Sequence, residues 1–382
     1  MSGLYVHIPF CASRCSYCGF YSTTLGAEWK ARYVAALCRE LMLRDGNRAW
    51  QTVYLGGGTP SQLPPALLEQ LFDAINDNGN PHPSSPAPLP WGRAGGGLEV
   101  TMEVNPDDVD KTLAATLRRL PVNRVSMGIQ TFDDNRLRRL HRRHTASQAR
   151  KAVELLHDAD IDNVSIDLML GFPDQTLDEW KDDVEKALLL DVQHVSAYSL
   201  AIEEGTPLYR EMKKNKTEPI DEEVWRRMYE WLMERMDKAG FEHYEISNFA
   251  RPGFRSRHNS IYWNGTPYVG IGAAAHSYDG EKRSWNVADV RTYIAAIENE
   301  DLPEEKEVLN EDTRYNDMVV TALRTREGIN LSEVDERHRH YLLDNARPHI
   351  KRGVLRIDAN RLHLTRKGIF VSDNIMSDLI MI

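Results

Sequence analysis

The sequence has no long hydrophobic run, little cysteine and no excess of positive charge. A transmembrane helix needs about 18 or more consecutive apolar residues, and no such stretch occurs among the 382 residues. The first residues also lack the basic segment, apolar segment and cleavage site of a secretory signal peptide. With only 4 cysteines, a disulfide framework is disfavoured and the cytoplasm is the expected location. The net charge of −10 argues against a broad nucleic-acid-binding surface, so we expect no nucleic-acid partner.

What is present is the composition of a globular protein. Hydrophobic residues make up 41% of the chain and charged residues 27%, which is typical of folded domains. A chain of this length buries a full core, and we expect one large domain over residues 1–300 followed by a smaller one over residues 301–382.

Three of the cysteines form a cluster. Cys11, Cys15 and Cys18 follow the apolar run 4–8 within eight residues. Three thiolates on one loop can bind three irons of a cubane iron–sulfur cluster and leave the fourth iron without a protein ligand, and an open coordination position is typical of a working metal centre. A zinc site is the alternative, but zinc needs a fourth ligand, and no second Cys-x-x-Cys follows. The fourth cysteine, Cys38, lies between leucines and is expected in the core.

Strand-like and helix-like stretches alternate along most of the chain. The strand-like stretches are 4–8, 52–55, 98–104, 124–129, 163–170 and 194–200, and the main helical ones are 27–44, 108–120, 146–159, 177–190 and 221–239. This alternation predicts an α/β fold with a parallel sheet and right-handed crossovers. Residues 78–97 are rich in Pro, Gly, Ser and Asn, and we expect a flexible surface insertion there.

Residues that could bind a ligand lie where these strands end. Gly56, Gly57 and Gly58 directly follow the second strand, and such glycines either let a ligand approach the backbone or form a tight strand-to-helix turn. Glu103, Gln130 and Asp167 lie at or near the ends of later strands. Because ligands of parallel α/β folds sit at the carboxyl ends of the strands, we expect one site built from several of them.

The last part of the chain has another character. Helices over 311–326, 332–343 and 346–353 precede a hairpin at 354–365 and a final helix ending at 380, which indicates a winged-helix-like module. The run Arg337–His340 is basic, but acidic residues at 333, 335 and 336 dilute it. We therefore interpret it as a solvated face rather than a DNA-binding surface.

The motifs together resemble a known superfamily. Cys-x-x-x-Cys-x-x-Cys after the first strand and Gly-Gly-Gly-Thr-Pro after the second resemble the radical S-adenosylmethionine (SAM) superfamily. Within it, the chain is similar over almost its whole length to the oxygen-independent coproporphyrinogen III oxidase group. The resemblance implies a partial (β/α)6 barrel related to the TIM barrel. It also implies a [4Fe–4S] cluster on Cys11, Cys15 and Cys18, whose fourth iron is chelated by the amino and carboxylate groups of SAM.

The same resemblance implies the SAM-binding residues. Tyr5 matches the tyrosine at the SAM sulfonium, and Glu103 and Asp167 match acidic residues that accept hydrogen bonds from ribose hydroxyls or the ammonium group. The full set is Tyr5, Tyr17, Gly57, Gly58, Thr59, Glu103, Gln130, Arg142, Asp167, Ala201 and His276. We assign no catalytic side chain from this resemblance.

Two departures from the oxidase pattern indicate a subgroup. Phe20 stands where the oxidases have a further cysteine, and no N-terminal extension precedes the first strand. The pattern Cys-x-x-x-Cys-x-Tyr-Cys-x-Phe instead resembles the HemW-type heme chaperones. Their proposed heme motif matches His258, Asn259, Tyr262 and Trp263, where an imidazole can bind iron and two aromatic rings offer flat surface. The alternative is a packed loop in which His258 only forms hydrogen bonds; His276 is a competing iron ligand.

Three functions follow from these patterns. The first is a cytoplasmic heme chaperone that binds the cluster, SAM and heme and transfers heme to an apoprotein. The second is a radical SAM oxidoreductase of porphyrin metabolism acting on a porphyrinogen. The third, a zinc-stabilised nucleic-acid module, leaves residues 56–60 and the strand–helix alternation unexplained. A reductant protein and a second copy of the chain, in a homodimer, are further partners compatible with the resemblance.

Overall fold

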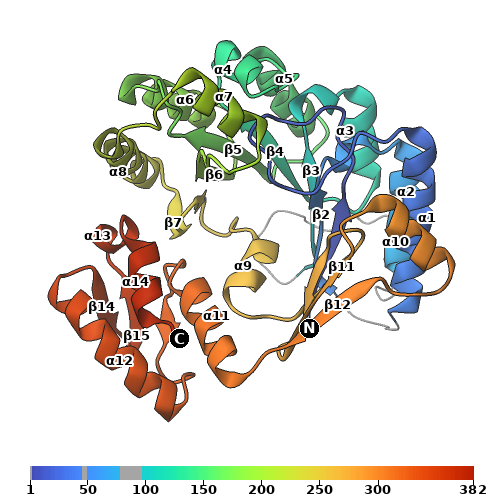
Figure 1. The fold of residues 1–382 in the computed structure, drawn as a ribbon. Coiled ribbons are helices and arrows are strands. Elements are labelled where there is room, and N and C mark those ends of the chain that lie inside the picture. Colours follow the sequence, from blue (N-terminus) through green and yellow to red (C-terminus); the bar gives the residue numbers. More distant parts are fainter. Residues whose placement is uncertain (1, 45–49, 78–96) are drawn as a thin grey trace.

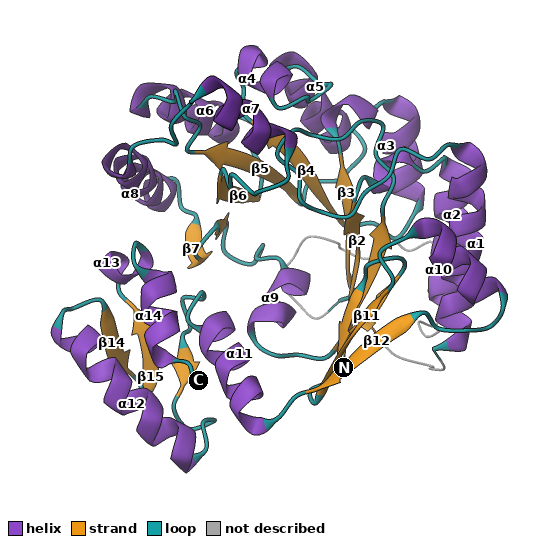
Figure 2. Ribbon diagram, viewed as in Figure 1, coloured by secondary structure: helices purple, strands orange, loops and turns teal. Residues whose placement is uncertain are grey.

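The computed structural model describes residues 2–44, 50–77 and 97–382. Its main element is a curved sheet with helices on the convex side (Figures 1 and 2). The first six strands are β1 (Ser2–Ile8), β2 (Trp50–Gly57), β3 (Glu99–Val104), β4 (Arg124–Gln130), β5 (Val164–Leu170) and β6 (His194–Ser199). The helices beside them are α1 (Ala27–Leu43), α2 (Pro65–Asp77), α3 (Lys111–Arg119), α4 (Asp134–Arg139), α5 (Ala146–His157) and α6 (Leu177–Leu188). Apart from Gly97, the predicted insertion lies outside the described residues.

The six strands pair in chain order, and every pair is parallel. The predicted partial barrel is therefore confirmed. The sequence did not predict how the sheet continues at its two edges. On the β1 side it gains β9 (Tyr268–Ile271), β10 (His276–Tyr278), β11 (Lys282–Asn286) and β12 (Glu304–Val308), and on the β6 side β8 (Asn248–Ala250) and β7 (Glu242–Glu245). At one edge β9 pairs with β1 in parallel, and at the other β8 pairs with β6 antiparallel.

Alternate residues of the parallel strands face different surroundings. In β1, Leu4, Val6 and Ile8 belong to the main hydrophobic core, so the side chains between them, including Tyr5, point to the concave side. The same period places buried polar residues on that side, among them Thr52, Thr101, Ser126 and Ser165, together with the half-buried Asp167. We call the space they enclose the lumen. A polar lining suits a polar ligand better than it suits hydrophobic packing.

A buried carboxylate ties α1 to the sheet extension. Glu40 is fully buried and accepts hydrogen bonds from the Gly272 N–H (2.8 Å), Asn286 Nδ2 (2.8 Å), the Tyr293 hydroxyl (2.6 Å) and Arg44 Nε (2.7 Å). Tyr293 belongs to α10 (Val290–Glu298). This network holds the non-parallel strands against the barrel.

Replacement of Glu40 by alanine is expected to lower the free energy of unfolding by about 3–5 kcal/mol, because Arg44 and three other donors lose their buried acceptor. Denaturant unfolding measures the change. Glu300→Ala is the control: Glu300 also pairs with an arginine, Arg39, at 2.5 Å, but is 67% exposed. Its loss is expected to cost less than about 1 kcal/mol. Equal effects of the two substitutions would contradict the role given to Glu40.

Residues 309–382, the C-terminal unit, have a second hydrophobic core around Val319, Leu342, Leu362 and Leu379. Its helices are α11 (Glu311–Ala322), α12 (Glu336–Lys351), α13 (Arg366–Ile369) and α14 (Ser372–Leu379), and its sheet has the order β13 (Ile329–Asn330), β15 (Arg361–Leu364), β14 (Leu355–Asp358). Helices with a small antiparallel sheet agree with the predicted winged-helix-like form. The unit lies on the concave side of the barrel, where α11 contacts α9 (Arg257–Trp263) (Figure 1).

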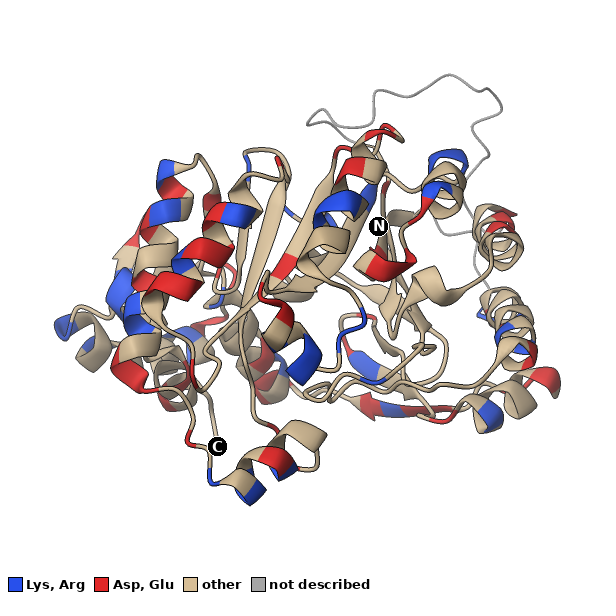
Figure 3. Cartoon of the chain, turned by 90° about the horizontal axis from the view of Figure 1, so that it is seen from above, with Lys and Arg blue, Asp and Glu red and all other residues tan. Residues whose placement is uncertain are grey.

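Two residues of the basic run in α12, Arg337 and His338, are paired with acidic residues. Arg337 is exposed and binds Asp312 at 2.8 Å. His338 departs from the predicted solvated face, because it is buried against Tyr315 and contacts Asp312 at 2.9 Å. Basic and acidic residues are likewise interspersed along the helices in Figure 3.

Two further helices, α7 (Pro207–Asn215) and α8 (Glu222–Lys238), follow β6. Across the described ranges, no helix is both long enough and apolar enough to cross a membrane.

Candidate functional site

The cysteines lie on the loop between β1 and α1. The two ends of this loop are joined by backbone hydrogen bonds between Cys11 and Thr23 (2.9 Å) and between Thr23 and Pro9 (2.7 Å). Its middle is anchored to other parts of the barrel, since the Ser16 N–H donates to Leu140 and the Ser16 carbonyl accepts from Leu208. The loop is thus fixed by residues far away in the sequence.

The thiols fit a cubane cluster. Cys11, Cys15 and Cys18 are free and half-buried. Among the residues that the structure describes, no three His, Cys, Asp or Glu side chains converge on a single ion position. Zinc needs its ligands around one point, whereas each thiolate of a cubane cluster binds a different iron. Three half-buried thiols on one loop are the donor set that a cubane cluster needs.

Polar groups surround the thiols. Arg142 Nη1 donates to Cys15 Sγ at 3.5 Å, and the Thr59 hydroxyl lies 3.6 Å from Cys11 Sγ. Burial raises the pKa values of the Cys11 and Cys18 thiols, so these residues are protonated until a metal binds. The guanidinium of Arg142 places a positive charge beside Cys15.

The glycine turn brings the end of β2 against the end of β1. Gly57 has φ +106°, and a Cβ atom there would lie 2.3 Å from the His7 ring. A Cβ on Gly58 would lie 2.6 Å from the backbone of Pro9. The fold itself therefore requires these glycines, as the tight-turn interpretation predicted. The same close packing places the turn beside the cysteine loop.

Two carboxylates lie in the lumen below this turn. Glu103 on β3 accepts from the Tyr54 hydroxyl (2.8 Å) and the Gly57 N–H (3.0 Å). Burial raises the pKa of Glu103 to about 7 and that of Asp167, on β5, to about 6. Neither forms a direct ion pair among the described residues. Both are therefore free to receive a cationic or hydroxyl-bearing ligand.

A bulge at the end of β4 turns Gln130 toward Arg142. The register of β4 against β5 shifts between Gly128 and Gln130, and Gln130 has φ +72°. Bulges of this kind redirect side chains next to active sites. Arg142 Nη2 donates to the Gly128 carbonyl (2.5 Å) and to Asn105 Oδ1 (2.8 Å), and Asn105 Nδ2 donates to the Thr59 hydroxyl (3.1 Å). Two predicted SAM residues, Thr59 and Arg142, are thus joined through Asn105 in one network.

Of the remaining predicted SAM residues, Tyr17 lies next to this network. The Tyr5 hydroxyl is 2.9 Å from His7 Nδ1, and Tyr17 is close enough to Arg142, Cys15 and Asp167 to interact electrostatically with them. His276 lies on β10 and stacks on Trp285. Burial lowers the pKa of His7 to about 4, and the nearby His276 contributes to this shift. Ala201 is exposed just after β6.

Comparison with known proteins identifies the family. Residues 5–187 match the radical SAM superfamily and residues 309–371 match the HemN C-terminal domain. The chain is 32% identical to the heme chaperone HemW of Bacillus subtilis (strain 168), over 98% of each chain. It is 33% identical to the heme chaperone HemW of Mycobacterium tuberculosis (strain ATCC 25618 / H37Rv), over 99% of this chain and 94% of the relative.

The chain belongs to the HemW family of radical SAM proteins. The resemblance seen in the cysteine loop is therefore confirmed. The solved structure of coproporphyrinogen III oxidase (HemN) from Escherichia coli, a radical SAM enzyme, matches with a TM-score of 0.81 and 21% identity, covering 99% of this chain and 90% of that chain. This likeness shows a shared fold. A radical SAM domain implies a [4Fe–4S] cluster and SAM, and the thiols, lumen carboxylates and glycine turn of this HemW-family chain fit both.

In this HemW-family chain, the residues of the predicted heme motif lie in two different surroundings. His258 is fully buried at the amino-terminal end of the lumen: its Nδ1 is 2.8 Å from the Thr52 hydroxyl and its Nε2 is 2.9 Å from the Tyr262 hydroxyl. Burial lowers the pKa of His258 to about 3, so the ring is neutral. This is the packed, hydrogen-bonded arrangement that the sequence left as the alternative. To bind iron, the ring would have to give up one of these two partners.

The other motif residues have contacts outside the lumen. The Asn259 N–H is capped by the Ser256 side chain at the start of α9. Tyr262 and Trp263 line a cavity next to the C-terminal unit, and the Arg324 guanidinium lies 5.4 Å from the centre of the Trp263 ring. One short motif thus contributes to two different spaces.

Three residues near the site were not predicted from the sequence. Tyr54 and Asn105 hold Glu103 and Arg142, and both stand in or next to motifs that the sequence shows, so their positions could have been found there. Arg124 could not. It is 1% exposed and lies in the lumen near Glu103 and Asp167, and its Nε atom has no hydrogen-bond partner among the described residues.

Proposed function

We propose that the chain is a heme chaperone: it binds a [4Fe–4S] cluster, SAM and heme, and transfers heme to acceptor proteins in the cytoplasm. The observation that carries this proposal is the match over nearly the full length to heme chaperones. When bound, the cluster supplies single electrons and one open iron position.

The residues of the chain have distinct roles in this proposal. Cys11, Cys15 and Cys18 hold three irons, and Arg142 donates to Cys15 Sγ and so stabilises the thiolate. Tyr54 and the Gly57 N–H fix the Glu103 carboxylate, which accepts a hydrogen bond from a ribose hydroxyl or the ammonium group of SAM. Asp167, on β5, is a second acceptor in the lumen.

The alternative is oxidation of a porphyrinogen. It is supported by the fold shared with coproporphyrinogen III oxidase, and at 21% identity that likeness concerns the fold alone. Phe20, in place of the further cysteine, is exposed beside the cluster loop.

The test uses the anaerobically reconstituted protein with SAM and dithionite, given either heme or coproporphyrinogen III. For a chaperone we expect heme uptake, seen in the Soret band, and transfer of the heme to apomyoglobin as a probe acceptor, without porphyrin products. Stoichiometric conversion of coproporphyrinogen with formation of 5′-deoxyadenosine and no heme retention would overturn the proposal.

A further inference from the structure

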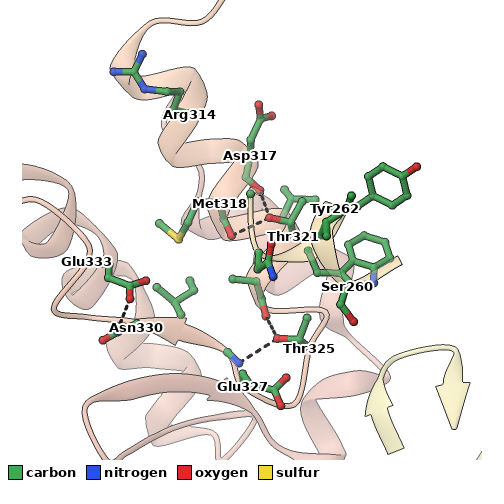
Figure 4. A pocket seen from close by; sticks show the side chains of 18 of the residues that line it. Ser260, Tyr262, Arg314, Asp317, Met318, Thr321, Thr325, Glu327, Asn330 and Glu333 are labelled. Atoms are coloured by element: carbon green, nitrogen blue, oxygen red, sulfur yellow. Dashed lines mark hydrogen bonds between the residues drawn. The ribbon is translucent and has the colours of Figure 1, made fainter. Parts of the chain in front are cut away.

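A cavity of about 820 Å³ lies between α9, the sheet extension and the C-terminal unit. Figure 4 shows that α11 forms one wall with Met318 and Thr321, and that Asn330 and Glu333 lie across from it. Sites for small molecules and cofactors range from about 300 to 1,000 Å³. The cavity is therefore large enough for a flat cofactor, and it is separate from the lumen residues that the SAM site uses.

The walls combine apolar surface with an unused hydrogen-bond donor. Ile261, Trp263, Met318 and Ile380 contribute apolar surface. The indole Nε1 of Trp263 is buried and has no hydrogen-bond partner among the described residues. A buried donor of this kind costs free energy unless a ligand or water satisfies it, so the wall indicates an occupant that carries acceptors.

Charge indicates the class of occupant. Four arginines and three carboxylates line the cavity. Arg255 and Arg283 are already paired with carboxylates, among them Glu327 and Asp317 of the lining. The third lining carboxylate, Glu333, accepts a hydrogen bond from Asn330. Arg314 and Arg361 contact only backbone carbonyl oxygens, at 2.8 Å and 2.7 Å. Two guanidinium groups without an acidic partner suit a ligand with two carboxylates. A flat, apolar molecule with two carboxylates has the chemistry of a tetrapyrrole with two propionates.

Met318 has the donor atom that an iron tetrapyrrole needs. Among the described lining residues there is no histidine or cysteine, and Met318 is the one sulfur ligand. Methionine is an established axial ligand of heme iron. The four lining phenols are less suitable. The Tyr244, Tyr262 and Tyr278 hydroxyls already have partners, and burial raises the pKa of Tyr268, which disfavours the phenolate.

We propose that this cavity is the heme site, with Met318 as an iron ligand and Arg314 and Arg361 bound to the propionates. His258 then acts as a positioning residue that holds Tyr262 from the lumen side. This inference rests on the proposed function, because it names where the chaperone holds its heme.

The experiment compares heme with iron-free protoporphyrin IX in titrations of the full chain. Met318→Leu keeps the side-chain volume nearly constant and is expected to weaken heme binding about tenfold or more and to remove the spectral signature of methionine-ligated ferric heme. Binding of iron-free protoporphyrin is expected to stay unchanged. The control is Met233→Leu, because Met233 is buried in α8, away from the cavity. It is expected to change neither titration.

The arginines have a different expected signature. Arg314→Ala and Arg361→Ala each remove a charged hydrogen bond and are expected to weaken heme and iron-free protoporphyrin alike, by about tenfold. An unchanged spectrum and affinity of Met318→Leu, together with loss of heme ligation in His258→Gln, would overturn this inference and leave the chaperone function standing. If the wild-type protein takes up no heme at all, the proposed function fails first and this inference fails with it.

Discussion

Replacement of Cys15 by alanine is expected to abolish the iron–sulfur cluster. Cys15 supplies one of only three thiolates in the loop, and Arg142 donates directly to its sulfur. With two cysteines left, a cubane cluster would have two irons without protein ligands. Iron and acid-labile sulfide should fall from about four each per chain to near zero after anaerobic reconstitution, and SAM binding through the open iron should be lost with them.

Cys38→Ala is the matched control for this experiment. Cys38 is also a half-buried free thiol, but it lies in α1, with its sulfur 3.9 Å from the Gln70 carbonyl oxygen. Its replacement should leave the iron and sulfide content unchanged. A full cluster in the Cys15→Ala protein, or an equal loss in the Cys38→Ala protein, would show that the metal is not bound at the predicted loop.

Replacement of Glu103 by glutamine is expected to weaken SAM binding about tenfold to a hundredfold at pH 8, because a charged acceptor becomes neutral. Burial raises the pKa of Glu103 to about 7. The wild-type carboxyl is therefore mostly ionised at pH 8 and mostly protonated at pH 6, and the difference between the two proteins should shrink on acidification. Calorimetric titration of the reconstituted proteins with SAM at both pH values measures it.

The same carboxyl makes stability depend on pH when SAM is absent. Its folded pKa, about 7, lies above the ordinary value of 4.5, so the folded state holds the proton more tightly than the unfolded state. Stability should therefore fall as the pH rises from about 4.5 to 7, and Glu103→Gln should remove this part of the dependence.

Glu245→Gln is the control for the SAM titration. Burial also raises the pKa of Glu245 to about 7, but this residue lies on β7, outside the predicted SAM site. Equal losses of SAM affinity in both variants would contradict the role of Glu103.

The order of the strands and helices could be predicted from the sequence, and so could the strand ends that carry the candidate site residues. Cys11, Glu103 and Asp167 follow or end strands whose apolar periodicity is clear, and strand ends of a parallel sheet meet at one edge. Their convergence therefore followed from the order of the elements. The four-stranded extension β9–β12 was not predicted, because its strands are short and their pairing depends on contacts with α1, such as those of Glu40.

The surroundings of the heme-motif residues could not be predicted from the sequence. His258 and Trp263 are close in sequence and read as one site, but α9 turns them toward different spaces. His258 lies beside Thr52, 206 positions away in the chain, whereas Trp263 lies beside Arg324 of the C-terminal unit. Neither contact has a signal in the residues next to the motif.

By itself, the sequence determined the cysteine loop, the alternation of strands and helices, and the strand ends that carry Glu103, Gln130 and Asp167. These features depend on local spacing and on the period of a strand, which neighbouring residues specify. Only the tertiary structure decided that the lumen is polar, that His258 is sealed inside it, and that α11 closes a cavity against α9. Those features arise from packing between segments far apart in the chain, because burial and hydrogen-bond partners exist only once the segments have met.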